Sequence, residues 1–263
     1  MLDEQVLDIQ VGEEFAREVL ARIPPGFLGV LLDGLEAKSR WFQATLSPEG
    51  LSLLDGPQAR KLLRTIFGTR RRADALVQAV GIDSLRQLLS TLLYGRGQVE
   101  ERFTEFCTLL DGACAQGEAI DLAGEALHYV LPERHWLWTR WMWNPRTQTG
   151  ALRFVVADWH TLLAPTPGEV YQRVGEAVAY AEAARESLGI FTDVQTHASL
   201  FLPDAYLACV YTLYLFTALR MRMSKEFTKV LPDPWELIQR LLGIYPREGE
   251  NAKARARQGG QDP

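Results

Sequence analysis

Short apolar repeats of helical period, each closed by a glycine or a proline, constrain the fold of this chain more than any other feature. Glycine closes such repeats because it tolerates the positive φ that ends a helix. Helices this short and this closely spaced are typical of a compact bundle with short connections. In the first half of the chain the repeats predict helices at 57–67, 71–80, 83–94 and 98–110.

Longer helical patterns flank this region. Two of them begin at strong start signals, Thr166-Pro167-Gly168-Glu169 and Asp233-Pro234-Trp235-Glu236, which combine an N-cap residue, a proline at the first helical position and a glutamate at the third. The chain is therefore predicted to be mainly α, a compact multi-helix bundle. The flanking helices are predicted at 3–22, 26–44, 117–131, 166–188, 203–226 and 233–242.

The helical pattern weakens in a few places. Ser47-Pro48 with Gly50 predicts a turn, and Leu152–Val156 is a strand candidate because it is rich in β-branched and aromatic residues. A strand needs a partner, so we expect at most one short β-hairpin, at about 136–157. The chain turns polar from Pro246, which predicts a disordered tail at 246–263 after a single helical domain at 1–245.

Composition limits the classes of protein. The chain is 47% hydrophobic and 23% charged, as soluble globular proteins are. Its net charge of −5 and its pI near 5.5 argue against a surface built entirely for nucleic acid. The cysteines Cys107, Cys114 and Cys209 are odd in number and have apolar neighbours, which favours reduced thiols in a cytoplasmic protein.

Neither a secretory signal nor a membrane span is expected. The N-terminus carries several acids and lacks both a basic start and an apolar core region. The segment 205–219 has no charge, but it is shorter than the ~20 apolar residues that cross a bilayer. We therefore expect a buried core helix there and no membrane insertion.

Four of the seven tryptophans fall within residues 136–143. Whether this segment is helical or extended, it places large aromatic side chains on two opposite faces. A structural aromatic core is one interpretation, since aromatics dominate core burial. A recognition surface is the other, since Trp and Arg are enriched at interface hot spots; its contact residues would be Trp136, Trp138, Arg140, Trp141, Trp143, Asn144 and Arg146.

A basic stretch reverses the sign of the overall charge. It carries six cations and no acid between Pro57 and Ala73. Such a stretch is either a solvated helix face or a patch for phosphate or for an acidic protein surface. The candidate residues are Arg60, Lys61, Arg64, Arg70, Arg71 and Arg72.

Few residues suggest catalysis. Glu125 and His128 have the spacing that puts a carboxylate and an imidazole on one helix face, as di-iron carboxylate bundles require, but no second Glu-x-x-His exists. We therefore predict no metal and no cofactor, with partly buried histidines as the simpler interpretation. The common nucleotide-binding, hydrolase and metalloprotease motifs are absent from the sequence, which leaves enzymatic activity uncertain.

One segment carries a family resemblance. Its elements include Leu93-Tyr94-Gly95, Glu101-Arg102-Phe103, Leu109-Leu110-Asp111-Gly112 and Leu131–Trp138. On these, residues 93–140 resemble a helix-hairpin-helix-like helical segment of restriction-associated, DNA-linked bacterial proteins. The resemblance implies a turn before the second helix whose backbone amides hold a phosphate. Here that turn, 111–117, is longer and lacks the compact Gly-x-Gly.

Three functional hypotheses follow. The first is a non-catalytic accessory module that binds another protein through the Trp-rich segment. The second is a nucleic-acid-associated protein that uses the basic stretch and the turn at Gly112. The third is an enzyme with a helical pocket around Glu125, His128, His135 and Trp138. Each leaves a homo-oligomer possible.

Overall fold

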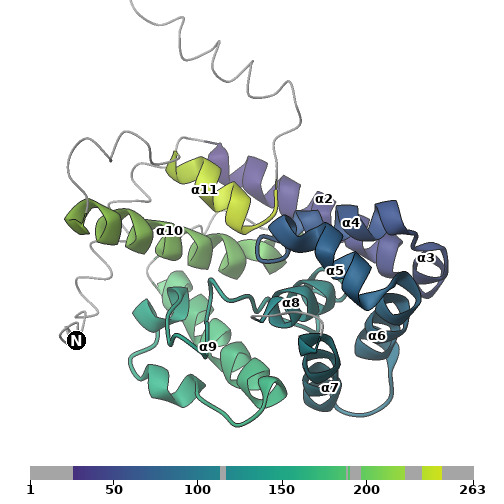
Figure 1. The fold of residues 1–263 in the computed structure, drawn as a ribbon. Coiled ribbons are helices and arrows are strands. Elements are labelled where there is room, and N and C mark those ends of the chain that lie inside the picture. The colour runs from purple at the N-terminus through teal and green to yellow at the C-terminus, as the bar shows by residue number, and fades with distance from the viewer. Residues whose placement is uncertain (1–25, 113–116, 188, 190–196, 223–232, 245–263) are drawn as a thin grey trace, which may run out of the picture.

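The computed structural model describes residues 26–112, 117–187, 189, 197–222 and 233–244, and in these it is built of helices (Figure 1). The mainly α prediction is confirmed. The α-helices are α2 (Phe27–Leu46), α3 (Pro48–Leu53), α4 (Gly56–Thr65), α5 (Ala73–Val80), α6 (Ile82–Tyr94), α7 (Val99–Asp111), α8 (Glu118–Val130), α9 (Pro167–Ser187), α10 (Leu202–Arg222) and α11 (Pro234–Leu241). The short 3-10 helices are η1 (Arg70–Arg72), η2 (Ala151–Phe154), η3 (Trp159–Leu162) and η4 (His197–Phe201).

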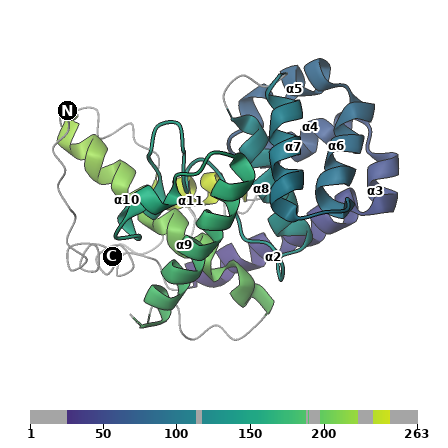
Figure 2. The ribbon, with the colours of Figure 1, turned by 90° about the horizontal axis from the view of Figure 1, so that it is seen from below.

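Helix α8 lies at the centre of the molecule. Figure 2 shows α3–α7 gathered on one side of it and α9, α10 and α11 on the other. Helix α8 packs against α2, α6 and α7, while α9 contacts both α7 and α10, and α11 contacts α10. Every residue of α8 except Ile120 is buried, so this one helix borders the core on all its sides.

The predicted helix starts agree with the capping contacts. The Thr166 hydroxyl accepts from the Glu169 backbone N–H at 3.3 Å, and the Asp233 carboxylate accepts from the Trp235 N–H at 2.8 Å. Both start signals therefore begin a helix at the predicted place, because the capping side chain accepts from a backbone N–H of the first turn. The chain breaks at Ser47 as predicted, but the break is a single residue: the Ser47 side chain accepts from the Gly50 N–H and caps the short helix α3, which contains Pro48 and Gly50.

The predicted strand at 152–156 is also wrong, since most of it forms η2 and the described residues contain no hairpin at 136–157. One isolated bridge joins Asn144 to Thr149. The Leu152 N–H donates to the Met142 carbonyl at 3.0 Å, and Gly150 takes a φ of 140°, so the chain turns back on itself too tightly to extend. Tertiary packing of the buried Leu152 overrides the β-propensity of its neighbours.

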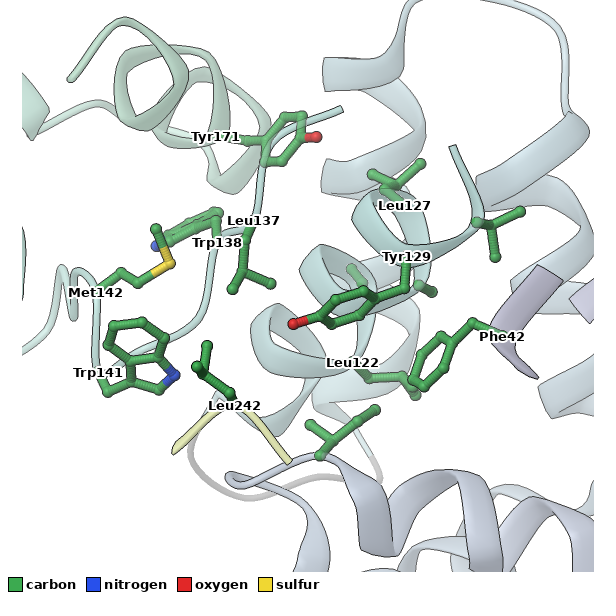
Figure 3. Packing of buried hydrophobic residues seen from close by; sticks show 14 of the residues in the cluster. Phe42, Leu122, Leu127, Tyr129, Leu137, Trp138, Trp141, Met142, Tyr171 and Leu242 are labelled. Carbon is green, nitrogen blue, oxygen red and sulfur yellow. The ribbon is translucent and has the colours of Figure 1, made fainter. Parts of the chain in front are cut away.

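The segment after α8 supplies much of the aromatic core (Figure 3). The ring of Trp138 stacks on Phe103 of α7 with centroids 5.3 Å apart, and Phe103 stacks in turn on Tyr171 of α9. The backbone of Trp138 crosses α8 at Gly124, where no Cβ would fit beneath the carbonyl oxygen. The segment therefore binds the two sides of the molecule together.

One segment of the described chain, Ser199–Phe216 at the end of η4 and in α10, is long and apolar enough to cross a membrane, and half of it is buried inside the protein. Cys107 on α7 and Cys209 on α10 are both buried. The helix predicted at 3–22, Cys114 and the tail predicted at 246–263 lie outside the described residues.

Candidate functional site

A polar stripe runs along one face of the buried helix α8. It consists of Glu118, Asp121, Glu125 and His128, whose spacing of three, four and three residues keeps them on one side of a helix. All four are buried, with exposed fractions of 4% or less. Buried charges are expensive unless they are paired, so the partners of this stripe decide what it does.

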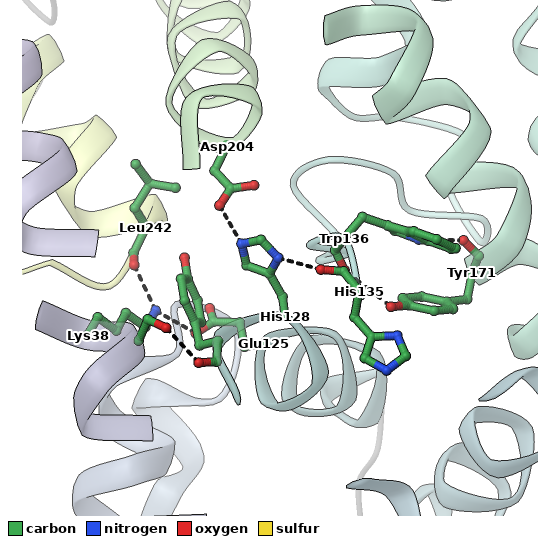
Figure 4. A network of polar contacts seen from close by, with 10 residues as sticks. Lys38, Glu125, His128, His135, Trp136, Tyr171, Asp204 and Leu242 are labelled. Atoms are coloured by element: carbon green, nitrogen blue, oxygen red, sulfur yellow. Dashed lines mark hydrogen bonds and ion pairs between the residues drawn. The ribbon is translucent and has the colours of Figure 1, made fainter. Parts of the chain in front are cut away.

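Glu125 pairs with a lysine that lies 87 residues earlier in the chain, on the neighbouring helix α2 (Figure 4). Its Oε2 lies 2.5 Å from Nζ of Lys38 on α2, and the same Nζ donates to the Leu242 carbonyl at 2.7 Å. The ammonium also lies 4.3 Å from the ring centroid of Tyr129. This one cation therefore joins α2, α8 and the end of α11.

His128 occupies the next turn of the stripe. Its Nε2 lies 2.7 Å from Oδ2 of Asp204 on α10, and its Nδ1 lies 2.8 Å from the His135 carbonyl oxygen (Figure 4). Both neighbours are hydrogen-bond acceptors, so both ring nitrogens must donate, which requires the protonated imidazolium. Burial lowers the pKa of His128, but the Asp204 carboxylate outweighs it, and the pKa is raised overall.

Two arginines pair with the remaining two acids of the stripe. Asp121 accepts from the Arg140 backbone N–H at 2.7 Å and from its Nε at 2.8 Å, and Glu118 lies 3.1 Å from Nη1 of Arg72. The four side chains of the stripe therefore meet partners from η1, from the segment after α8, from α2 and from α10. This polar stripe ties the surrounding elements to the central helix.

Burial decides the direction of the pKa shift for Glu125, Asp121 and the partner Lys38. It raises the pKa of Glu125 from 4.5 to about 7, against the opposing effect of Lys38. It likewise raises the pKa of Asp121 and lowers that of Lys38. Such shifts occur at catalytic sites, but they also mark structural ion-pair networks. Here each group is already paired and none lines either of the two described surface depressions, so the geometry is that of a structural network.

The proposed pocket around Glu125, His128, His135 and Trp138 is not assembled as an open site. Glu125 and His128 share a face of α8, as their spacing predicts, but each is bound to a different partner. Burial lowers the pKa of His135 to about 4, and Trp138 is a fully buried core residue. Among the described residues no three His, Cys, Asp or Glu side chains are grouped to hold a metal ion.

The tryptophans proposed as a partner-binding surface are core residues. Trp138 and Trp143 are fully buried and Trp141 is 5% exposed. Trp136 is half-buried, and its ring lies flat against Gly175 of α9. These rings are turned inward because they fill the space between α7, α9 and α10, so a partner could not contact most of them.

The polar members of the same set lie differently. Arg140 is half-buried in its ion pair with Asp121, 2.6 Å from Nη2 to Oδ2. Asn144 is half-buried in the turn, and its side chain accepts from the Arg146 backbone N–H. Arg146 is exposed. A partner at this end of the molecule would therefore meet the turn at 144–149 and not the indole rings.

The cations of the basic stretch lie on α4 and η1, which contact each other, and are named together the cationic face: Arg60, Lys61, Arg64, Arg70, Arg71 and Arg72. Arg60 and Arg64 of α4 share Asp74 of α5 at 3.1 and 2.8 Å, which fixes α4 beside η1 and α5. Lys61 Nζ lies 5.1 Å from the ring centroid of Trp41. Arg72 lies 3.1 Å from Glu118, and the sequence itself places no acid between Pro57 and Ala73 to offset these cations.

A groove of about 430 Å³ separates α5, α6 and α7. Its lining is mixed, with apolar Leu88, Leu92 and Phe106 beside charged Arg102 and Glu105, and Leu109 lies in it with 57% of its surface exposed. Large apolar side chains this exposed are candidates for contact with another molecule.

Several of these residues were not predicted from sequence. Lys38 and Asp204 lie 87 and 76 residues from the α8 side chains they bind, and no local pattern points to them. The polar stripe did leave a signal, because four ionisable residues at helical spacing interrupt an otherwise apolar helix. Comparison of the chain with protein-family models, with curated proteins and with solved structures finds no match.

Proposed function

We propose that this chain is a binding module that associates with nucleic acid through the cationic face. The observation that carries the proposal is the position of this face beside the start of α8. Arg72 pairs with Glu118, the first residue of α8, and Arg140 packs against Gly117 just before it. Cations of the basic stretch and of the segment after α8 therefore meet at the N-terminal end of the central helix.

Charge supports the same assignment. A protein with a net charge of −5 repels a polyanion on average, so binding requires a local excess of cations. Lys61, Arg64, Arg70 and Arg71 are all exposed, on an outer helix face and on the following 3-10 turn. Several exposed cations on adjoining elements suit contact with a polyanion more than with a single small anion.

Removal of two exposed cations should weaken this binding. We expect Lys61→Ala/Arg71→Ala to bind DNA or RNA about 10-fold more weakly at low salt, and to reduce the slope of log K against log salt by about 2. Fluorescence anisotropy with a labelled oligonucleotide over a salt series measures both. The matched control, Arg96→Ala/Arg146→Ala, removes the same charge from exposed positions elsewhere and should bind as the wild type does. Equal weakening of both variants, or no salt-dependent binding by the wild type, contradicts the proposal.

A second candidate function is the first sequence hypothesis, a non-catalytic protein-interaction module. The groove between α5, α6 and α7 favours it, and moves the contact surface away from the buried tryptophans. Its apolar side chains and the exposed Leu109, beside the charged Arg102 and Glu105, fit an amphipathic helix or loop of a partner protein better than a phosphate backbone.

A charge at the edge of the groove should remove such a partner. We expect Leu109→Glu to lose at least about 90% of any protein that co-purifies with the wild type at native levels, since burying an unpaired carboxylate in an apolar interface is unfavourable. Leu53→Glu, at an apolar position that is 72% exposed on α3, is the control. Quantitative mass spectrometry of the three preparations compares them, and retention of the same proteins by Leu109→Glu argues against this function.

A further inference from the structure

We infer that the cationic face takes single-stranded nucleic acid, with an unpaired base stacked on the ring of Phe67; this inference rests on the proposed function. Phe67 lies in the turn between α4 and η1, three residues after Arg64 and three before Arg70. Its side chain is 43% exposed although it is one of the largest apolar side chains of the protein. An aromatic ring placed between cations is the usual platform for a base in a single strand.

The turn that carries Phe67 is held in place from both sides. Ile66 before it is fully buried, and Thr69 after it is fully buried with its hydroxyl donating to the Leu63 carbonyl at 2.6 Å. The Arg70 N–H donates to the Ile66 carbonyl at 3.0 Å, which closes the turn. Because its neighbours are fixed inward, Phe67 has to point outward.

Asp121 of the polar stripe and its partner Arg140 hold the same turn on its inner side. Gly68 lies against the Asp121 carboxylate so closely that a Cβ would overlap it, and its carbonyl accepts from Arg140 Nη2 at 3.5 Å. The exposed ring is therefore mounted on a rigid support that reaches into the core. A rigid aromatic loses little conformational freedom when it binds, which is the property of an anchor residue.

The cations on either side of the Phe67 ring supply contacts to phosphates, which stacking does not. Arg64, which pairs with Asp74 at the surface, precedes the ring on α4, and Arg71 follows it in η1; both are exposed. A strand that crosses this turn would place phosphates near these cations while one base lies on the ring. A duplex keeps its bases stacked on each other and offers none to Phe67, so it would gain only the phosphate contacts.

The test compares one sequence in three forms: a labelled single strand, its duplex, and an abasic strand with the same phosphates. We expect the wild type to bind the single strand about 10-fold more tightly than the other two. Phe67→Ala should bind all three equally, Phe67→Trp should keep the preference, and Phe67→Leu should lose it because it retains apolar area without a π face. Tyr180→Ala, at a 53% exposed aromatic on α9, is the control and should behave as the wild type.

The outcomes separate this inference from the proposed function. Salt-dependent binding with no preference for the single strand, or with a preference that Phe67→Ala retains, overturns the stacking inference and leaves the cationic face as a phosphate-binding surface. Absence of binding to all three forms overturns both. Because the Phe67 side chain is largely at the surface, its variants should keep the thermal midpoint of the wild type, which circular dichroism checks.

Discussion

Gly124→Ala should unfold this protein or destabilise it by about 3 kcal/mol or more, although alanine is the better helix former. Gly124 lies in the middle of α8, where the backbone of Trp138 crosses it, and a Cβ would overlap the Trp138 carbonyl oxygen. That oxygen belongs to backbone, which cannot rotate away as a side chain can. The segment after α8 would have to move, and the stacking of Trp138 on Phe103 would be lost with it. Chemical denaturation followed by circular dichroism measures the change.

A glycine at an exposed position of a helix gives the matched control. Gly29 lies on α2, is exposed, and has no atom within 4 Å of the position of an added Cβ. Gly29→Ala should therefore stabilise the protein by up to about 1 kcal/mol through helix propensity alone. If Gly124→Ala had the same small effect, the segment at 138 could not cross α8 as described.

The helices could be predicted from sequence because their ends are decided by residues next to them. The Pro and Glu that follow Thr166 and Asp233 fix where α9 and α11 begin, whatever packs on them later. The strand predicted at 152–156 failed for the opposite reason. Its residues favour extended structure, but the tight return that Gly150 allows and the burial of Leu152 against distant helices decide its form.

In the candidate surfaces, too, contacts between neighbours in sequence could be predicted and contacts between distant residues could not. The spacing of Glu125 and His128 predicts that they share a helix face, and they do. Their partners Lys38 and Asp204 could not be predicted, because only the complete fold brings them together. The burial of Trp138 was likewise undecided, since two aromatic faces are compatible with a core or with a contact surface. Phe67 was missed because an apolar residue in a helical repeat is normally assigned to the core.

The aromatic core stabilises the fold by burying apolar area, whereas the polar stripe on α8 mainly makes the packing specific. Its pairs specify which surfaces of α2 and α10 meet the central helix, since a shifted register would leave a charge buried without a partner. Whether such pairs add net stability depends on the desolvation of both partners, so removal of one partner differs greatly from removal of both.

Lys38→Met should cost about 3–5 kcal/mol near neutral pH, because it leaves the Glu125 carboxylate buried without its cation. Replacement of both partners, as Lys38→Met/Glu125→Leu, should recover most of this loss, since two apolar side chains of similar size need no desolvation. Urea denaturation of the wild type and both variants measures the three free energies of unfolding. If the double variant were as unstable as the single one, the cost would come from the lost bond to the Leu242 carbonyl and from packing instead.

The pH dependence distinguishes these two causes. Burial already raises the pKa of Glu125 to about 7 with Lys38 present, and without Lys38 that pKa should rise further. A folded-state pKa above the unfolded one means that the folded protein holds the proton more tightly, so stability falls as the pH rises from about 4.5 through the folded pKa. The loss in free energy of unfolding caused by Lys38→Met should therefore be small at about pH 5.5, where the Glu125 carboxyl is neutral. It should be large at about pH 8, because there the folded protein has to keep a proton that the unfolded chain releases, or bury the charge. A packing defect would cost the same at both pH values, and a penalty independent of pH would show that Glu125 does not depend on Lys38 for its charge.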